Sequence, residues 1–301
     1  MRKIEIGTSG IYASAVSLGC MRVHGQDELV DAVIKAAWEA GIDFFDHADI
    51  YGTEECFAAS VSRLGLPRGQ MILQSKCGIR KGYFDFSREH IVTSVEGILK
   101  RLRTDYLDIL LLHRPDTLME PDEVASAFDE LHGSGKVRHF GVSNQNPGQM
   151  ELLQASLKHK LVANQLQFSM TNTGMLDHGL NVNMQIDRSV DRDSDVLNYC
   201  RLKKVTIQAW SPFQYGFFAG SFLGNPKFPE LNLAIDRLAQ RYAVTNTTIA
   251  IAWILRHPAQ MQAIIGTTNP QRVRQSAQAA DIVLTRPEWY ELYRAAGNAL
   301  P

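Results

Sequence analysis

The feature that most constrains the fold is an alternation of short apolar runs with longer amphipathic stretches along the 301 residues. Runs rich in Val, Ile, Leu and Phe are typical of strands buried on both faces of a parallel sheet. Eight such runs occupy residues 15–18, 42–45, 71–74, 107–112, 137–142, 161–166, 205–209 and 263–265. Apolar residues recur at helical spacing in the segments between them, at 27–40, 87–102, 121–132, 147–157, 245–256 and 270–279.

Eight strand–helix units predict a single α/β domain over residues 1–301, folded as a (β/α)8 TIM barrel. Residues 3–6 and 11–13 flank a Gly-containing turn and predict a short β-hairpin before the first barrel strand. Residues 171–195, with a short helix, and 217–230 are expected to be long loops at the C-terminal face. A doubly wound sheet is disfavoured because Gly19 stands alone where that fold places a G-x-G-x-x-G fingerprint.

Charge and cysteine usage exclude several classes of protein. Lys plus Arg number 31 and Asp plus Glu 32, so no basic excess favours nucleic acid as a partner. Four cysteines without a C-x-x-C pair favour a reducing, cytoplasmic location. The first ten residues lack the apolar run of a signal peptide, and no stretch approaches the ~18 apolar residues of a membrane span. No apolar stripe beyond the core is evident, so we expect a monomer.

Polar side chains end three successive predicted strands. Asp46, Lys76 and His113 stand at these ends, and Tyr51 follows Asp46 by five residues. Each has an ordinary explanation alone, such as a helix cap or a surface cation, but strand ends converge at the catalytic face of a barrel. An ammonium beside a phenol lowers its pKa from about 10, and a carboxylate keeps that ammonium charged. With a second donor from His113, this cluster suits proton donation during hydride transfer to a carbonyl.

Residues at the remaining strand ends suit a nicotinamide cofactor. Ser143, Asn144 and Gln165 offer the donors and acceptors that a carboxamide needs, and Trp210 offers a stacking face. The last strand leads through Thr267 and Thr268 into a helix beginning at Pro270. A helix N-terminus binds phosphate, and Arg272 can add a charge-assisted contact.

These residues stand in motifs that resemble the aldo-keto reductase family over nearly the whole chain. The motifs are GIDFFDHADIYG, LQSKCG, LDILLLHRPD, GKVRHFGVSN, ANQLQFS, QAWSPF and GTTNPQRVRQS. The resemblance implies a barrel that binds a nicotinamide cofactor without a dinucleotide fold. It also implies carbonyl reduction by Asp46, Tyr51, Lys76 and His113, with Tyr51 as proton donor and Met21 beside the substrate.

The resemblance further implies the cofactor contacts. Ser143, Asn144 and Gln165 would meet the nicotinamide amide, Trp210 would stack on its ring, and Ser211 and Phe213 would line the pyrophosphate path. The adenosine end would lie among Gly266, Thr267, Thr268, Arg272, Gln275 and Ser276. Gly266 replaces a lysine that many family members carry, but Arg272 and Thr267 favour NADP over NAD.

Two other functions are compatible with the sequence. One is a cofactor-binding regulatory barrel with little turnover. The other is a metal-dependent barrel hydrolase, with His47, Asp49, His113 and Asp116 as ligands, although Lys76 would place a cation beside the metal. We expect His47 to pack behind its strand, Cys20 and Cys77 to be buried fillers rather than redox groups, and the loop after the seventh strand to close over the cofactor. The sequence identifies neither the substrate nor the direction of reaction.

Overall fold

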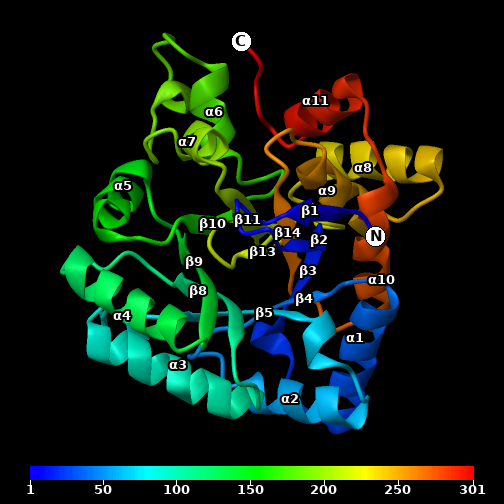
Figure 1. The fold of residues 1–301 in the computed structure, drawn as a ribbon. Helices are drawn as coiled ribbons and strands as arrows, with labels where there is room; N and C mark the ends of the chain where they lie inside the picture. The colour runs from blue at the N-terminus through cyan, green and yellow to red at the C-terminus, as the bar shows by residue number, and fades with distance from the viewer.

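The computed structural model describes residues 1–301 and centres on a closed barrel of eight parallel strands (Figure 1). Neighbouring strands follow chain order, and the last strand pairs with the first. The strands are β3 (Val16–Gly19), β4 (Phe44–Asp46), β5 (Ile72–Cys77), β8 (Leu107–Leu112), β9 (Val137–Ser143), β10 (Leu161–Gln167), β11 (Thr206–Trp210) and β14 (Gln262–Ile265). All eight overlap the predicted runs, which confirms the (β/α)8 barrel.

Helices form the outer layer of the barrel (Figure 1). They are α1 (Asp27–Glu39), α2 (Glu54–Arg63), α3 (Arg88–Leu102), α4 (Pro121–Gly133), α5 (Pro147–Ser156), α6 (Gly174–Leu180), α7 (Val196–Lys203), α8 (Pro229–Tyr242), α9 (Asn246–Leu255), α10 (Pro270–Gln278) and α11 (Arg286–Ala295). Side-chain caps fix where several helices begin. At the start of α3 the Ser87 side chain accepts from His90 N, and at the start of α5 Asn146 forms a capping box with Gln149.

The six predicted helices are confirmed, whereas α2, α7, α8 and α11 are absent from the prediction. Helix α8 shows why such a helix is overlooked. It begins at Pro229, directly after a stretch rich in Gly, Pro and Phe that obscures the helical period. Its apolar positions, including Leu231, Ile235 and Leu238, face the core.

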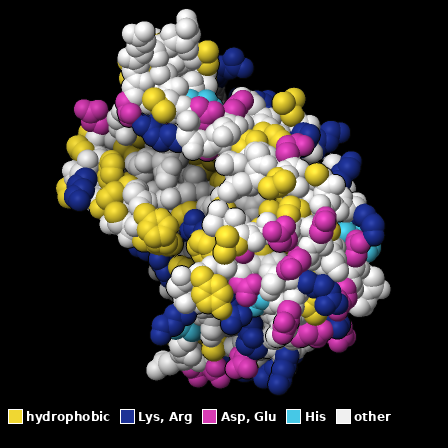
Figure 2. Space-filling view, turned by 90° about the vertical axis from the view of Figure 1, so that its left-hand side faces the viewer, with side chains coloured by type: hydrophobic (Ala, Val, Ile, Leu, Met, Phe, Trp, Pro, Cys, Tyr) yellow, Lys and Arg dark blue, Asp and Glu magenta, His cyan; other side chains and the backbone are white.

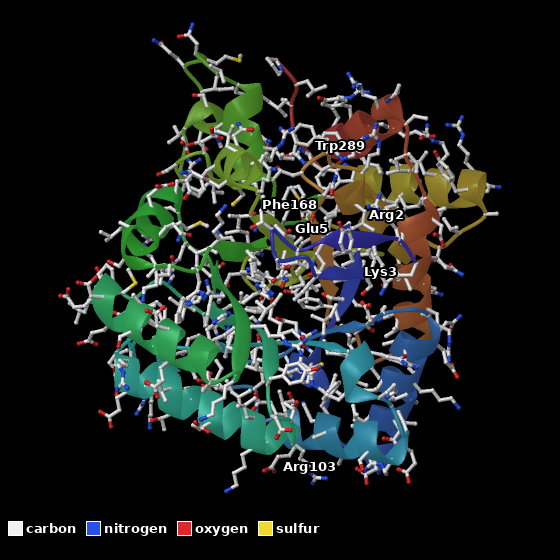
Figure 3. All side chains as sticks on the ribbon, in the orientation of Figure 1. Arg2, Lys3, Glu5, Arg103, Phe168 and Trp289 are labelled. Carbon is white, nitrogen blue, oxygen red and sulfur yellow. The ribbon has the colours of Figure 1, made fainter.

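The predicted N-terminal hairpin is confirmed as β1 (Lys3–Glu5) and β2 (Tyr12–Ser14), and it lies across one end of the barrel (Figure 3). The Gly7 N–H donates to Thr206 Oγ1 at 2.7 Å. Gly7 has φ +58°, and a Cβ there would lie 2.5 Å from the Val162 carbonyl oxygen. Only glycine therefore lets this turn approach β10 and β11 so closely.

Two further hairpins, β6 (Ile79–Arg80) with β7 (Tyr83–Phe84) and β12 (Gln214–Tyr215) with β13 (Gly220–Ser221), lie outside the prediction. The expected loop 217–230 therefore includes β13 and the start of α8. The stretch 171–195 does contain the expected short helix, α6. It is anchored to the C-terminal segment, where Tyr293 donates to Asp177 Oδ1 at 2.6 Å.

One connected apolar core unites barrel and helices. An aromatic stack extends it outward: the ring centroids of Phe168 and Trp253 lie 5.2 Å apart, and those of Trp253 and Trp289 lie 4.8 Å apart (Figure 3). Figure 2 shows acidic and basic side chains interspersed over the face it presents, in keeping with the balanced composition. None of the helices combines the length and apolar character needed to cross a bilayer.

Candidate active site

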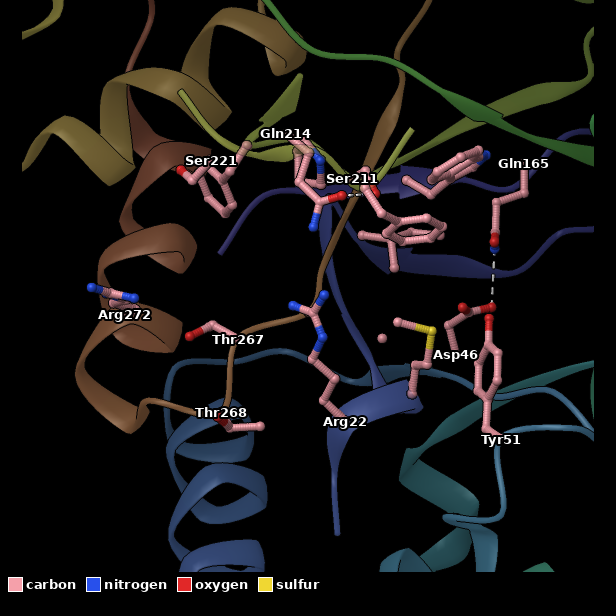
Figure 4. A pocket seen from close by; sticks show the side chains of 18 of the residues that line it. Arg22, Asp46, Tyr51, Gln165, Ser211, Gln214, Ser221, Thr267, Thr268 and Arg272 are labelled. Atoms are coloured by element: carbon pink, nitrogen blue, oxygen red, sulfur yellow. Dashed lines mark hydrogen bonds between the residues drawn. The ribbon is translucent and has the colours of Figure 1, made fainter. Parts of the chain in front are cut away.

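A cavity of about 860 Å³ lies where the barrel strands end (Figure 4), a volume typical of small-molecule and cofactor sites. Most of the predicted site residues line it. They are Met21, Asp46, Tyr51, His113, Ser143, Asn144, Gln165, Trp210, Ser211, Phe213, Gly266, Thr267, Thr268, Arg272 and Gln275. Lys76 and Ser276 do not line it.

Lys76 is fully buried behind the cavity wall, where it contacts two other predicted residues. Its Nζ donates to Asp46 Oδ2 at 2.7 Å and to the His47 carbonyl oxygen at 2.7 Å. The same atom lies 3.4 Å from the Tyr51 hydroxyl. The Tyr51 and His113 rings meet edge to face, with centroids 5.9 Å apart. The strand ends thus bring all four side chains together.

Ser276 is misplaced by the sequence prediction. It is fully buried, and its hydroxyl donates to the Arg272 carbonyl oxygen at 2.8 Å within α10. Its side chain therefore faces the helix backbone and not the cavity. Helix α10 is capped by Asn269, whose side chain accepts from Gln271 N at 2.9 Å.

The titration of Tyr51 differs from expectation. Burial raises the pKa of Tyr51, and the opposing effect of Lys76 does not compensate for it. Burial alone would lower the Lys76 pKa, but Asp46 and Tyr51 together raise it, so the ammonium form persists. The predicted lowering of the phenol pKa is therefore wrong: Lys76 does lower it, but burial raises it by more.

His113 is neutral at physiological pH. Burial, with smaller effects from Lys76 and Arg114, lowers its pKa to about 2. Its Nδ1 is buried and has no hydrogen-bond partner. A lone pair is the less costly group to bury without a partner, so we assign the proton to Nε2, on the cavity side. This tautomer can donate to an oxygen inside the cavity.

A chain of hydrogen bonds orients the residues beside Trp210. The Ser143 hydroxyl donates to the Gln165 carbonyl oxygen at 3.0 Å, and Asn144 Nδ2 donates to Ser143 Oγ at 2.7 Å. Trp210 Nε1 donates to Asn144 Oδ1 at 3.1 Å. Asn144 has φ +57°, a conformation that asparagine tolerates better than most residues. The indole plane is thereby held beside the cavity.

Comparison with known proteins identifies the family. Residues 15–296 match the model of the Aldo/keto reductase family. The chain belongs to this family. It is 38% identical to Oxidoreductase YdhF of Escherichia coli over 98% of each chain. It is 34% identical to 6-dehydroglucose reductase of Agrobacterium fabrum, over 89% of this chain and 87% of the relative. An aldo-keto reductase from Klebsiella pneumoniae in complex with NADPH superposes with a TM-score of 0.80 at 25% identity, covering 99% and 96% of the two chains.

An aldo/keto reductase is an oxidoreductase that uses a nicotinamide cofactor on small carbonyl compounds, and the cavity of this one fits such a cofactor. Arg22, Arg114 and Arg272 line the cavity, and none of them forms an ion pair. Asp46 is the only acidic residue of the lining, and Lys76 neutralises it. Unpaired guanidinium groups and the N-terminus of α10 match the phosphate groups of a dinucleotide.

Arg22 and Arg114 of this aldo/keto reductase are absent from the sequence prediction. Arg22 projects between Asp46 and the Thr267–Thr268 pair (Figure 4). Arg114 lies over the Trp210 ring, 5.6 Å from its centroid. Arg114 lies two residues after β8, and Arg22 ends the short 3-10 helix Cys20–Arg22 that follows β3. Extending the strand-end rule that identifies His113 to the next few residues could have found both. Asn246 and Thr247 of α9 also line the cavity, and no sequence signal indicates this.

The candidate metal ligands are not brought together. His47 packs edge-on against Phe57, with centroids 4.6 Å apart, as expected for a residue behind the strand. Burial lowers its pKa to about 3. The one close group of ligand-type side chains is His178 of α6 with Asp191 and Asp193 of the segment before α7, and it does not include Asp49, His113 or Asp116.

Two remaining expectations concern the thiols and the long polar stretch. Cys20 and Cys77 are fully buried, and burial raises the pKa of both thiols. A buried neutral thiol is unreactive, so the filler interpretation fits the structure. None of residues 171–195, which are expected to form a loop at the C-terminal face, lines the cavity.

Proposed function

We propose that this protein reduces small aldehydes or ketones with NADPH and that Tyr51 donates the proton. The observation that carries the proposal is the contact of Lys76 with Asp46 and Tyr51 at the wall of a cavity that His113 also faces. A bound reduced nicotinamide supplies the hydride. The residues of the chain must then hold the carbonyl oxygen and protonate it.

Tyr51 and His113 supply two donors for one oxygen. The neutral imidazole donates from Nε2 and keeps no charge of its own near the developing alkoxide. When the Tyr51 proton moves to the alkoxide, the nearby Lys76 ammonium stabilises the phenolate that remains. Asp46 holds that ammonium in place at 2.7 Å. Each side chain thus has a defined part in one proton transfer.

The cavity offers a place for each part of NADPH. Gln165, Asn144 and Ser143 would hold the carboxamide and Trp210 would stack on its ring, with Ser211 and Phe213 along the pyrophosphate. Gly266, Thr267, Thr268, Arg272 and Gln275 would surround the adenosine end. Arg22 supports this assignment because its guanidinium stands midway along the cavity (Figure 4). The unpaired Arg272 favours a 2′-phosphate and hence NADPH over NADH.

The substrate end of the cavity combines Met21 with Tyr51, His113 and Arg114. A half-buried guanidinium without an ion pair favours carbonyl compounds that carry oxygen-rich groups. Two relatives named 6-dehydroglucose reductase, at 34% and 32% identity, support a polar carbonyl substrate.

Cofactor titration followed by a substrate panel tests the proposal. NADPH and then NADH are titrated into the protein while tryptophan fluorescence is followed, because Trp210 lines the cavity. We expect saturable quenching with NADPH preferred, and oxidation of NADPH when polar aldehydes are added. Binding without turnover of any carbonyl would favour the regulatory barrel, and binding of neither cofactor would contradict the proposal.

A further inference from the structure

Four glutamines cross the interior of the barrel beneath the proposed active site. Gln74 of β5, Gln165 of β10, Gln208 of β11 and Gln262 of β14 are each at least 96% buried, and we call them the glutamine network. An apolar interior would be the simpler way to fill a barrel, because each buried amide must find partners for all of its polar atoms. The network therefore requires an explanation.

The hydrogen bonds of the glutamine network link all four amides and fix their orientations. Gln262 Nε2 donates to the Ser14 carbonyl oxygen at 2.9 Å, and Gln262 Oε1 accepts from Gln208 Nε2 at 2.9 Å. Gln208 and Gln74 exchange two bonds, at 2.9 and 3.0 Å. A backbone carbonyl can only accept, so it fixes the orientation of Gln262 at one end, and the Asp46 carboxylate, which also only accepts, fixes that of Gln74 at the other.

At its other end the network meets Asp46. Gln74 Nε2 donates to Asp46 Oδ1 at 2.6 Å, and Gln165 Nε2 donates to the same oxygen at 3.0 Å (Figure 4). The second carboxylate oxygen, Oδ2, accepts from Lys76. Hydrogen bonds to a charged acceptor are the strong ones, so these contacts restrict both the position and the rotation of the carboxylate. Gln165 also reaches Gln208 Oε1, at 3.3 Å.

We propose that Gln74, held by Gln208, is a positioning residue that fixes the Asp46–Lys76 pair for proton transfer from Tyr51. This inference rests on the proposed function. Gln74 touches neither the cavity nor a reacting atom, and it acts on Lys76 only through the Asp46 carboxylate. Without Gln74, Asp46 Oδ1 would lose the shorter of its two hydrogen bonds. The Asp46 carboxylate could then shift, and the Lys76 ammonium bonded to it would shift as well. Small displacements of reacting groups can cost about 100-fold in rate.

A carboxyl group introduced at position 74 would report on this contact. The titratable groups around Asp46 do not change their protonation state near neutral pH. The pKa values of Lys76, Tyr51 and Cys20 are raised, so these groups stay protonated. The pKa of His113 is about 2, so its imidazole stays neutral. Burial raises the pKa of Asp49 to about 6 and that of Glu54 to about 7, in wild type and variants alike. The pH dependence of a variant's rate, taken relative to wild type, therefore reports only the titration of the carboxyl group introduced at position 74.

The test compares kcat for NADPH-dependent reduction in wild type, Gln74→Met, Gln74→Glu and Gln262→Met, between about pH 5 and pH 8. Gln262→Met is the matched control, because it removes an equally buried glutamine from Gln208 without touching Asp46.

We expect Gln74→Met to lose about 10- to 100-fold in kcat at every pH. The carboxyl group introduced by Gln74→Glu can, when protonated, still donate one hydrogen bond to Asp46, so the relative rate of this variant should rise as the pH falls. Gln262→Met should stay within about threefold of wild type.

Three results would overturn the inference. Gln74→Met could keep nearly the wild-type kcat, Gln262→Met could lose as much as Gln74→Met, or Gln74→Glu could have a relative rate independent of pH. NADPH binding and the unfolding temperature show whether each variant is folded, and Gln74→Glu, which keeps the shape of glutamine, decides the question if Gln74→Met does not fold. An active wild type with an unaffected Gln74→Met would overturn only this inference. A wild type that reduces no carbonyl would overturn the proposed function as well.

Discussion

Lys76 Nζ lies 2.7 Å from Asp46 Oδ2 but 3.4 Å from the Tyr51 hydroxyl. The ammonium is therefore anchored on the carboxylate and only loosely joined to the phenol. Because the phenol is protonated in this state, a long contact costs little. A phenolate formed during reaction would draw the ammonium closer, which is the direction that assists proton donation.

Tyr51→Phe removes the proposed proton donor and nothing else from the cavity wall. We expect kcat to fall by about 100- to 10,000-fold while the NADPH dissociation constant is nearly unchanged. Steady-state kinetics and fluorescence titration measure the two quantities. Tyr83→Phe is the control, since Tyr83 is exposed on β7 and does not line the cavity. Retention of most activity in Tyr51→Phe would assign proton donation to another group.

Loss of the Tyr51 proton should lower the rate of reduction at alkaline pH. The proton donor must be protonated, and burial raises the pKa of Tyr51 above its usual value of 10.0. The active form therefore persists through neutral pH and is lost as the pH rises past that pKa. His113, with a pKa of about 2, adds no loss near pH 6 to 7. A pH profile of kcat/KM checks this, and an alkaline limb below about pH 9 would mean that Lys76 outweighs burial in the ternary complex.

Arg272→Ala should weaken NADPH binding by about 10-fold or more and leave NADH binding almost unchanged. The reason is that only NADPH carries the phosphate that an unpaired guanidinium at this end of the cavity would bind. Arg274→Ala is the matched control, because Arg274 lies two residues away in α10, contacts Glu39 and does not line the cavity. Equal losses of affinity for NADPH and NADH would show that Arg272 does not contact the 2′-phosphate.

Gly266→Lys should strengthen NADPH binding several-fold. A Cβ at Gly266 meets no atom within 4 Å, and Gly266 is not among the glycines with positive φ, so a side chain fits without strain. The new ammonium would add a cation at the proposed adenosine end, worth about 1 kcal/mol near a phosphate. Fluorescence titration against wild type measures the gain. No gain, or a gain shared equally by NADH, would place the 2′-phosphate elsewhere.

Glu288 should stabilise the fold above mildly acidic pH. It accepts from Arg241 Nη1 at 2.8 Å, from the Tyr242 hydroxyl at 2.7 Å and from Thr285 N at 2.7 Å. Burial opposes these bonds, but together they lower its pKa from 4.5 to about 2. The stabilisation is therefore complete above about pH 4.5 and is lost as the pH falls toward 2.

Glu288→Gln should accordingly lower the free energy of unfolding at neutral pH by about 1 to 3 kcal/mol. Urea unfolding at neutral and acidic pH measures the difference, which should shrink on acidification. Glu291→Gln, on the same helix and paired with Arg237 nearer the surface, should cost under about 1 kcal/mol. A loss in Glu288→Gln that does not depend on pH would assign the effect to packing rather than charge.

The sequence alone determined the barrel, because its eight buried strands are short and mostly apolar runs, which can be recognised without any tertiary contact. It also determined most of the cavity lining, since the ends of parallel strands share one face of a barrel. This is why Asp46, Lys76 and His113 could be predicted to meet. The same rule applied more widely would have found Arg22 and Arg114.

Only the tertiary structure decided which side chains face the cavity, how the buried groups titrate and which buried amides meet. Whether Ser276 faces the cavity or its own helix depends on a rotation that no residue pattern specifies. The titration of Tyr51 depends on how far burial outweighs the Lys76 charge, and burial is a property of the assembled barrel. Gln74, Gln165, Gln208 and Gln262 lie far apart in the chain, and each alone reads as a polar residue in an apolar strand. Their network exists because closing the barrel brings four strands around one axis.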